Sequence, residues 1–92
     1  MQEIYLVVER EFNVSTPLRA YLKKEDALKE CERLAKGKYD EKIGISEALA
    51  KNYEAGRHVD FDKNDGFALY SIIGGKRNKP EIYFCATKIN LQ

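Results

Sequence analysis

The sequence predicts an α+β domain: one antiparallel sheet of four to five strands with two helices on one face, in the order β-β-α-α-β-β-β. Apolar residues alternate over residues 3–9, which is typical of a strand. A 3.6-residue apolar period over 24–36 indicates a helix, and strand-like patterns return over 67–73 and 81–89. A length of 92 residues predicts a single domain spanning 1–92.

The first two strands are expected to form a hairpin with a longish loop. Residues 3–9 are apolar on both faces, which favours an inner position in the sheet. Residues 18–22 alternate again, and this pattern predicts that Leu18, Ala20 and Leu22 point inward.

Two helices are expected in the middle of the chain. The first covers 24–36, and Gly37 suits a C-terminal cap. Residues 38–44 are then a connection, and Ser46 is a plausible N-cap of a shorter helix that runs to Ala55. The apolar stripe of the first helix consists of Ala27, Leu28, Cys31, Leu34 and Ala35.

The last third of the chain reads as three strands separated by turns. Val59 and Phe61 alternate with polar residues, and the polar segment 63–66 ends in Gly66, a turn signal. The segment 74–80, which begins with two glycines, is expected to form the final turn.

Charge and cysteine content limit the class of protein. Sixteen basic and fifteen acidic residues give a net charge of +1, which favours neither a bulk nucleic-acid binder nor a mimic of nucleic acid. The apolar run near the start is too short for a signal peptide or a membrane helix, so a cytoplasmic, reducing location is expected. Cys31 and Cys85 are then expected to be free thiols, with a disulfide as the alternative.

Three cations lie close together in the segment 74–80: Lys76, Arg77 and Lys79. Glycine allows close approach of a ligand, and lysine and arginine suit phosphate, so this hairpin tip is the candidate contact to nucleic acid, a nucleotide or an acidic protein surface. The simpler interpretation is a solvated polar loop, which a lone charge cluster favours. The spacing of a phosphate-binding P-loop is absent.

The segment 60–66 partly matches a calcium loop, because Asp60, Asp62 and Asn64 occupy the first three ligand positions. The match then fails, because the glycine comes one residue late and Ser71 occupies the position that needs a glutamate. A plain turn is therefore the favoured interpretation.

His58 is the only histidine, and strand alternation would place it on the same face as Asp60. The two could form an ordinary surface pair or the dyad of a small nuclease, but no nucleophile motif accompanies them. A zinc site would need His58, Cys31, Cys85 and a further ligand, and no ligand spacing supports it. We therefore assign no catalytic residue, metal or cofactor.

Three apolar segments of the chain form a pattern: the run 4–8, then 18–22 leading into the charged helix, and the closing strand at 82–84. This pattern resembles small phage and prophage proteins over residues 3–36 and 80–90. It implies a small accessory protein that binds a host protein, including components of anti-phage defence such as CRISPR-type systems. It transfers no site residue.

The expected function is that of a non-enzymatic binding protein that inhibits or redirects a host protein. The candidate contact surfaces are the sheet edges and the loops at 38–44 and 74–80. The alternatives are a nucleic-acid or nucleotide binder acting through Lys76, Arg77 and Lys79, and a small nuclease-like enzyme. A free sheet edge also leaves homodimerisation open.

Overall fold

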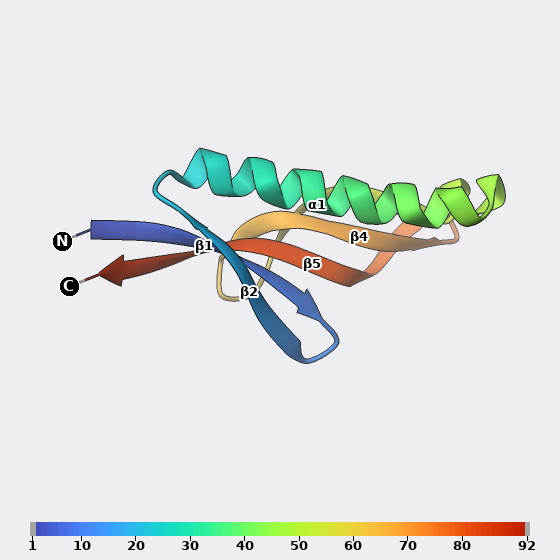
Figure 1. Cartoon of the computed structure of the whole chain (residues 1–92). Coiled ribbons are helices and arrows are strands. Elements are labelled where there is room, and N and C mark those ends of the chain that lie inside the picture. The colour runs from blue at the N-terminus through green and yellow to red at the C-terminus, as the bar shows by residue number, and fades with distance from the viewer. Residues whose placement is uncertain (1, 92) are drawn as a thin grey trace.

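The chain folds into one antiparallel sheet of five strands with a long helix across one face (Figure 1). This computed structural model describes residues 2–91 and confirms the α+β class. The strands lie in the order β2-β1-β5-β4-β3. In chain order the elements are β1 (Gln2–Glu11), β2 (Val14–Tyr21), α1 (Lys24–Ile45), the 3-10 helix η1 (Glu47–Lys51), β3 (Tyr53–Val59), β4 (Asp65–Ile73) and β5 (Lys76–Leu91).

Strand β1 is an inner strand, as its two apolar faces predicted. It pairs with β2 on one side and with β5 on the other. Val7 is fully buried in the core beneath α1, whereas Val8 belongs to a second apolar cluster on the opposite face. Val7 and Val8 are therefore buried on opposite faces of the strand, which explains why both faces of the run are apolar.

The helix α1 is longer than predicted, and the prediction that it ends at Gly37 was wrong. Gly37 keeps a helical backbone, and the expected connection 38–44 is the last part of the same helix. Ala27, Cys31 and Ala35 form its buried ridge at four-residue spacing, and Tyr39 packs partly buried one turn further on. Burial of this extra turn outweighs the cost of about 1 kcal/mol that glycine imposes within a helix.

The second, shorter α-helix expected from Ser46 to Ala55 does not form, so that prediction was also wrong. Ser46 does cap the short η1, because its hydroxyl accepts a hydrogen bond from the backbone N–H of Ala48 at 3.3 Å. The chain then becomes extended at Tyr53. Tyr53 and Ala55 alternate toward α1 and pack against its core, and this tertiary contact overrides the helical pattern.

Two strand boundaries also differ from prediction. β2 begins at Val14, and Tyr21 is the residue near its end that packs against the core, so the predicted inward-facing residues Leu18, Ala20 and Leu22 are exposed. β5 begins at Lys76, so the predicted turn 74–80 is only two residues long. Gly74 and Gly75 both have positive φ angles, 60° and 76°, as a tight two-residue hairpin requires.

The two cysteines are free and buried on opposite faces of the sheet, which confirms the expected thiols. Cys31 lies in the core between α1 and the sheet, and Cys85 lies in the apolar cluster on the other face. Burial raises the pKa of Cys31 to about 12 and also raises the pKa of Cys85. Both side chains therefore act as small apolar residues.

Two glycine substitutions should have opposite effects on stability. An added Cβ at Gly66 would lie 2.0 Å from the carbonyl oxygen of Phe84 and 2.7 Å from Cα of Cys85, whereas a Cβ at Gly37 would meet nothing within 4 Å. We expect Gly66→Ala to lower the free energy of unfolding by about 1–3 kcal/mol or more, because backbone atoms must shift. Gly37→Ala should raise it by about 1 kcal/mol through helix propensity.

Urea unfolding followed by circular dichroism measures both changes. A loss of stability in Gly37→Ala would contradict an uninterrupted α1, because it would mean that this residue needs a left-handed backbone.

Candidate functional site

The three cations predicted as one binding site are divided by the fold. Arg77 lies over the ring of Tyr70, with its guanidinium carbon 4.6 Å from the ring centroid. Its Nε and one terminal nitrogen donate to the carboxylate of Glu54 at 3.1 and 2.7 Å, and this bond holds the pKa of Glu54 below its usual value. Arg77 therefore ties β5 to β3 across β4. Within residues 2–91, Lys76 and Lys79 take part in no ion pair.

His58 does not pair with Asp60 as the alternation suggested. Its Nδ1 lies 2.7 Å from the hydroxyl oxygen of Tyr70, and its ring packs edge-on against Tyr83 with the centroids 4.6 Å apart. Asp60 instead forms an ion pair with Arg10 and accepts the backbone N–H of Asn64. Residues 60–64 thus form a turn held to β1 in place of a calcium loop, but the turn comes earlier than the predicted 63–66, because β3 ends at Val59 and β4 begins at Asp65.

The hydrogen bonds around His58 favour one tautomer. The Tyr70 hydroxyl donates its single proton to the backbone carbonyl of Arg57 at 2.9 Å. Nδ1 of His58 must then donate to the Tyr70 oxygen, which leaves Nε2 as an acceptor when the ring is neutral. Burial lowers the pKa of His58, and Arg77 adds to that effect while Asp60 opposes it.

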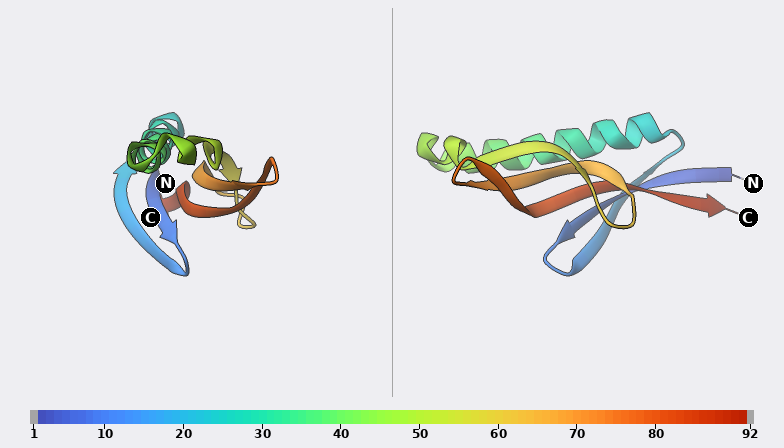
Figure 2. Two further views of the ribbon diagram at one scale, coloured as in Figure 1. Left: turned by 90° about the vertical axis from the view of Figure 1, so that its right-hand side faces the viewer. Right: turned by 180° about the vertical axis from the view of Figure 1, so that it is seen from behind.

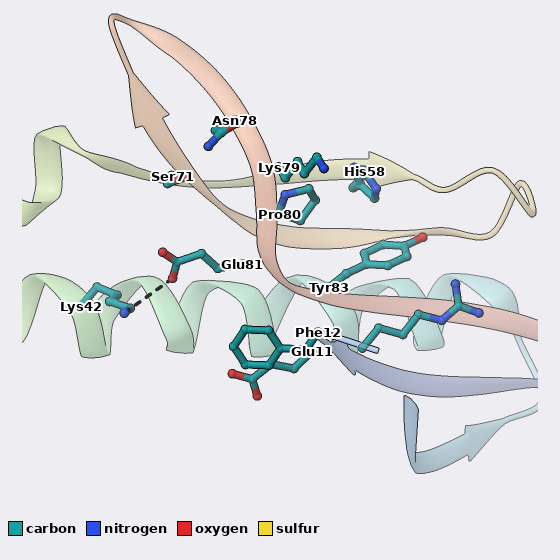
Figure 3. Close-up of a pocket in the computed structure, with 11 residues that line it drawn as sticks. Glu11, Phe12, Lys42, His58, Ser71, Asn78, Lys79, Pro80, Glu81 and Tyr83 are labelled. Carbon is teal, nitrogen blue, oxygen red and sulfur yellow. Dashed lines mark ion pairs between the residues drawn. The ribbon is translucent and has the colours of Figure 1, made fainter. Parts of the chain in front are cut away.

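A cleft of about 750 Å³ lies beside this cluster, between the β1–β2 hairpin tip and the first residues of β5 (Figure 3). Phe12 and Glu11 lie on one side of it, and Lys79 and His58 lie on the other. The cleft is lined by both acidic and basic side chains. Two of them, Lys42 and Glu81, form an ion pair at 3.6 Å. Of the predicted cations, Lys79 lines this cleft and Arg77 does not.

The two edges of the sheet differ in how they are protected. β2 contains Pro17 and has a bulge at Leu18. The pairing shows the bulge: Val7 pairs with Arg19 and Val8 pairs with Pro17, so Leu18 has no partner on β1. Both features disfavour the addition of another strand. β3 pairs with β4 in unbroken register from Tyr53 to Val59 and contains no proline. Its outer edge therefore presents a regular row of backbone donors and acceptors.

The outer edge of β3 runs beside α1, as the view from behind shows (Figure 2). Two hollows lie between them, of about 370 and 220 Å³. We call this surface the α1/β3 groove. Its helix side consists of Glu25, Leu28, Lys29, Glu32, Lys36, Tyr39 and Asp40, and its strand side consists of Tyr53, Glu54, Ala55, Arg57 and Phe67 of the adjoining β4.

Sequence reasoning missed this groove because both of its walls were assigned wrongly. Residues 38–44 were expected to be a loop and 46–55 a helix, so Tyr39 and Tyr53 could not be placed opposite each other. The helix residues of the groove do follow a signal that was present, since 25, 28, 29, 32, 36, 39 and 40 share one side of a continuous helix.

No helix in the described part of the chain, residues 2–91, is long and apolar enough to cross a membrane. Over the same residues, no cluster of three or more histidine, cysteine, aspartate or glutamate side chains could hold a metal ion. No family model, no curated protein and no solved structure matches this chain.

The environment of His58 predicts a pH-dependent loss of stability. Because its pKa is lower in the folded protein than the value of 6.5 expected on unfolding, the unfolded chain takes up the proton first as pH falls. The contribution of His58 to the free energy of unfolding is therefore complete above about pH 6.5, and it is lost as pH falls toward the pKa of His58 in the folded protein. His58→Asn, which keeps a donor near the Nδ1 position, should show a smaller loss between pH 7.5 and 5.5 in urea unfolding.

An equal loss in His58→Asn and the wild type would show that other groups cause the pH dependence. Tyr70→Phe is the matched comparison, because it removes the hydroxyl that His58 contacts while the titrating ring remains.

Proposed function

We propose that this chain is a non-enzymatic binding protein that acts by direct contact with a partner protein through the outer edge of β3. The observation that carries the proposal is the contrast between the two sheet edges. β2 is interrupted by Pro17 and the bulge at Leu18, whereas β3 pairs in unbroken register over its seven residues and has no proline. Soluble proteins normally protect such an edge, so an unprotected one is a preferred place for another chain to pair.

The groove beside β3 adds side-chain contacts to the backbone pairing. Tyr39 and Tyr53 are partly buried and line it, and aromatic side chains are enriched in protein interfaces. Backbone hydrogen bonds along the edge would contribute about 0.5–1.5 kcal/mol each, and the hollows would select among partners.

The biological setting that we propose follows from the resemblance to phage and prophage proteins over residues 3–36 and 80–90. The chain would be an accessory protein of a phage or mobile element, working in the host cytoplasm. Its partner would be a host protein, such as a component of a defence system, which it inhibits or redirects.

The proposal predicts that a charge exchange in the α1/β3 groove weakens partner capture. Lys36→Glu combined with Asp40→Lys keeps the net charge and changes only this groove. The matched control exchanges Lys38 and Glu41, which pair with each other outside the groove, at 3.7 Å. Tagged proteins are incubated with host lysate, and the captured protein is quantified by mass spectrometry.

We expect the groove exchange to reduce capture about tenfold, because about 1.4 kcal/mol of favourable contact would be lost, and the control to leave it unchanged. Equal capture by both exchanged variants would reject the edge of β3 as the contact. Failure to enrich any protein over an unrelated bait would reject the binding function itself.

A second candidate function is nucleic-acid binding, and the observation that favours it is the position of Lys76 and Lys79. Neither is neutralised by an ion pair within residues 2–91, and Lys79 lines the cleft with Arg10. This candidate predicts binding to single-stranded DNA that weakens steeply with salt, because neutralised phosphates release counterions.

Fluorescence anisotropy with Lys76→Ala, Arg77→Ala and Lys79→Ala, separately and together, tests this candidate. Loss of binding in the two lysine variants would support it. Unchanged affinity in the triple variant would reject it. Arg77→Ala alone also frees Glu54, so its effect on unfolding is measured in parallel.

A further inference from the structure

The α1/β3 groove has the length of a short extended peptide. From Glu25 to Asp40 the helix side spans about 22 Å, at 1.5 Å per residue. From Tyr53 to Val59, β3 spans about 20 Å, at roughly 3.3 Å per residue. A seven-residue strand laid along β3 would therefore lie against α1 over its whole length, with alternate side chains directed toward the helix.

The larger hollow fits an apolar or aromatic side chain. Tyr39, Tyr53 and Ala55 line it, and the two charges beside them, Lys36 and Asp40, are opposite in sign. Glu54, which also borders it, is already neutralised by Arg77 across the sheet. The hollow therefore carries no net charge for an incoming charged side chain to neutralise.

The smaller hollow fits a basic side chain. Its apolar wall is Leu28 with Phe67, and its charged rim contains Glu25, Glu32 and Lys29. Arg57 packs over the Phe67 ring at 5.4 Å and is neutralised by Asp65 at 3.1 Å. Within residues 2–91 neither glutamate has an ion-pair partner, so the rim has an acidic excess.

The two hollows are spaced for side chains four residues apart on an extended strand. Tyr53 at the larger hollow and Arg57 at the smaller one are themselves four residues apart on β3, about 13 Å. On the helix, the distance from Tyr39 to the middle of the stretch between Leu28 and Glu32 is also about 13 Å. Residues four apart on a strand point to the same side, so both could face α1.

We propose that the α1/β3 groove binds an extended segment of a partner protein that carries a lysine or arginine followed four residues later by an aromatic or large aliphatic residue. The segment adds to β3 as a sixth, antiparallel strand, in keeping with every other strand pair of the sheet. Its basic residue lies between Glu25 and Glu32, and its apolar residue enters the hollow at Tyr39. This inference rests on the proposed protein-binding function and specifies its ligand.

The probe is a fluorescein-labelled nine-residue peptide of threonines, with an arginine at the third position and a phenylalanine at the seventh. A control peptide of the same composition has the two residues three positions apart, which places them on opposite sides of the strand. Anisotropy titration of the wild-type chain should show at least about tenfold tighter binding of the first peptide. Equal affinity for the two peptides would overturn the spacing.

Charge variants of the chain test the basic subsite. Glu25→Lys with Glu32→Lys should weaken binding of the probe at least about tenfold, because two attractive charges become repulsive. The control Glu41→Lys with Glu47→Lys makes the same change in net charge outside the groove and should leave the affinity within about twofold. An equal effect of both variants would indicate bulk attraction and overturn the subsite.

Backbone methylation of the peptide tests strand addition directly. Alternate amide N–H groups of a strand point to opposite edges, and only one edge of an added strand forms hydrogen bonds with β3. Methyl groups on the amide nitrogens of that edge should therefore abolish binding. Methyl groups on the amide nitrogens of the other edge should not. Tolerance of both sets would overturn strand addition.

Two further outcomes separate this inference from the proposed function. If a captured host protein still binds Glu25→Lys with Glu32→Lys at full strength, the ligand assignment fails while the binding function stands. If the wild-type chain sediments as a dimer that the groove exchange dissociates, a second copy occupies the groove and the peptide assignment is overturned.

Discussion

The fold depends on backbone pairing along β5, the sixteen-residue strand at the centre of the sheet. Its second half pairs with β1 from Ile82 to Leu91, and its first part pairs with β4 from Lys76 to Ala86. The two strand pairs overlap only around Phe84, where side chains from both hairpins meet beneath α1. Without this overlap the β1–β2 and β3–β4 pairs would have no common core, since each alone is too small to be stable.

Among residues 2–91, no further helix or sheet covers the face of the sheet opposite α1, and ion pairs of long side chains lie across it. Arg77 spans from β5 over Tyr70 to Glu54, and Arg10 joins β1 to the turn at Asp60. The guanidinium groups of Arg77 and Arg10 lie over the rings of Tyr70 and Tyr83, which belong to the apolar cluster around Cys85, and both charges stay paired. Arg77, one of the three cations predicted to contact phosphate, is therefore part of the protein's own packing.

Some features of the fold could be predicted from the spacing and type of neighbouring residues alone. The inner position of β1, the start of α1 and the free thiols all followed from periodicity and compartment. The end of α1 did not, because Gly37 is a cap signal whose effect is overridden by burial of Tyr39 on the next turn. Likewise the helical pattern after Ser46 gives way to strand pairing with β4, a contact that a single sequence does not reveal. The candidate groove lies between these two segments, so it could not be predicted before both were corrected.

Because the two thiols are buried on opposite faces of the sheet, their accessibility can be used to follow the opening of each face separately. Because both thiols are fully buried, we expect Cys31 to react with a thiol reagent only when α1 lifts from the sheet, and Cys85 only when the opposite face opens. Because the raised pKa values suppress reaction in the closed state, labelling rates at the two positions record two opening events separately. A partner that adds a strand to β3 beside α1 would slow the reaction at Cys31 more than at Cys85, so the extent of thiol modification, measured by mass spectrometry, would report occupancy of the groove.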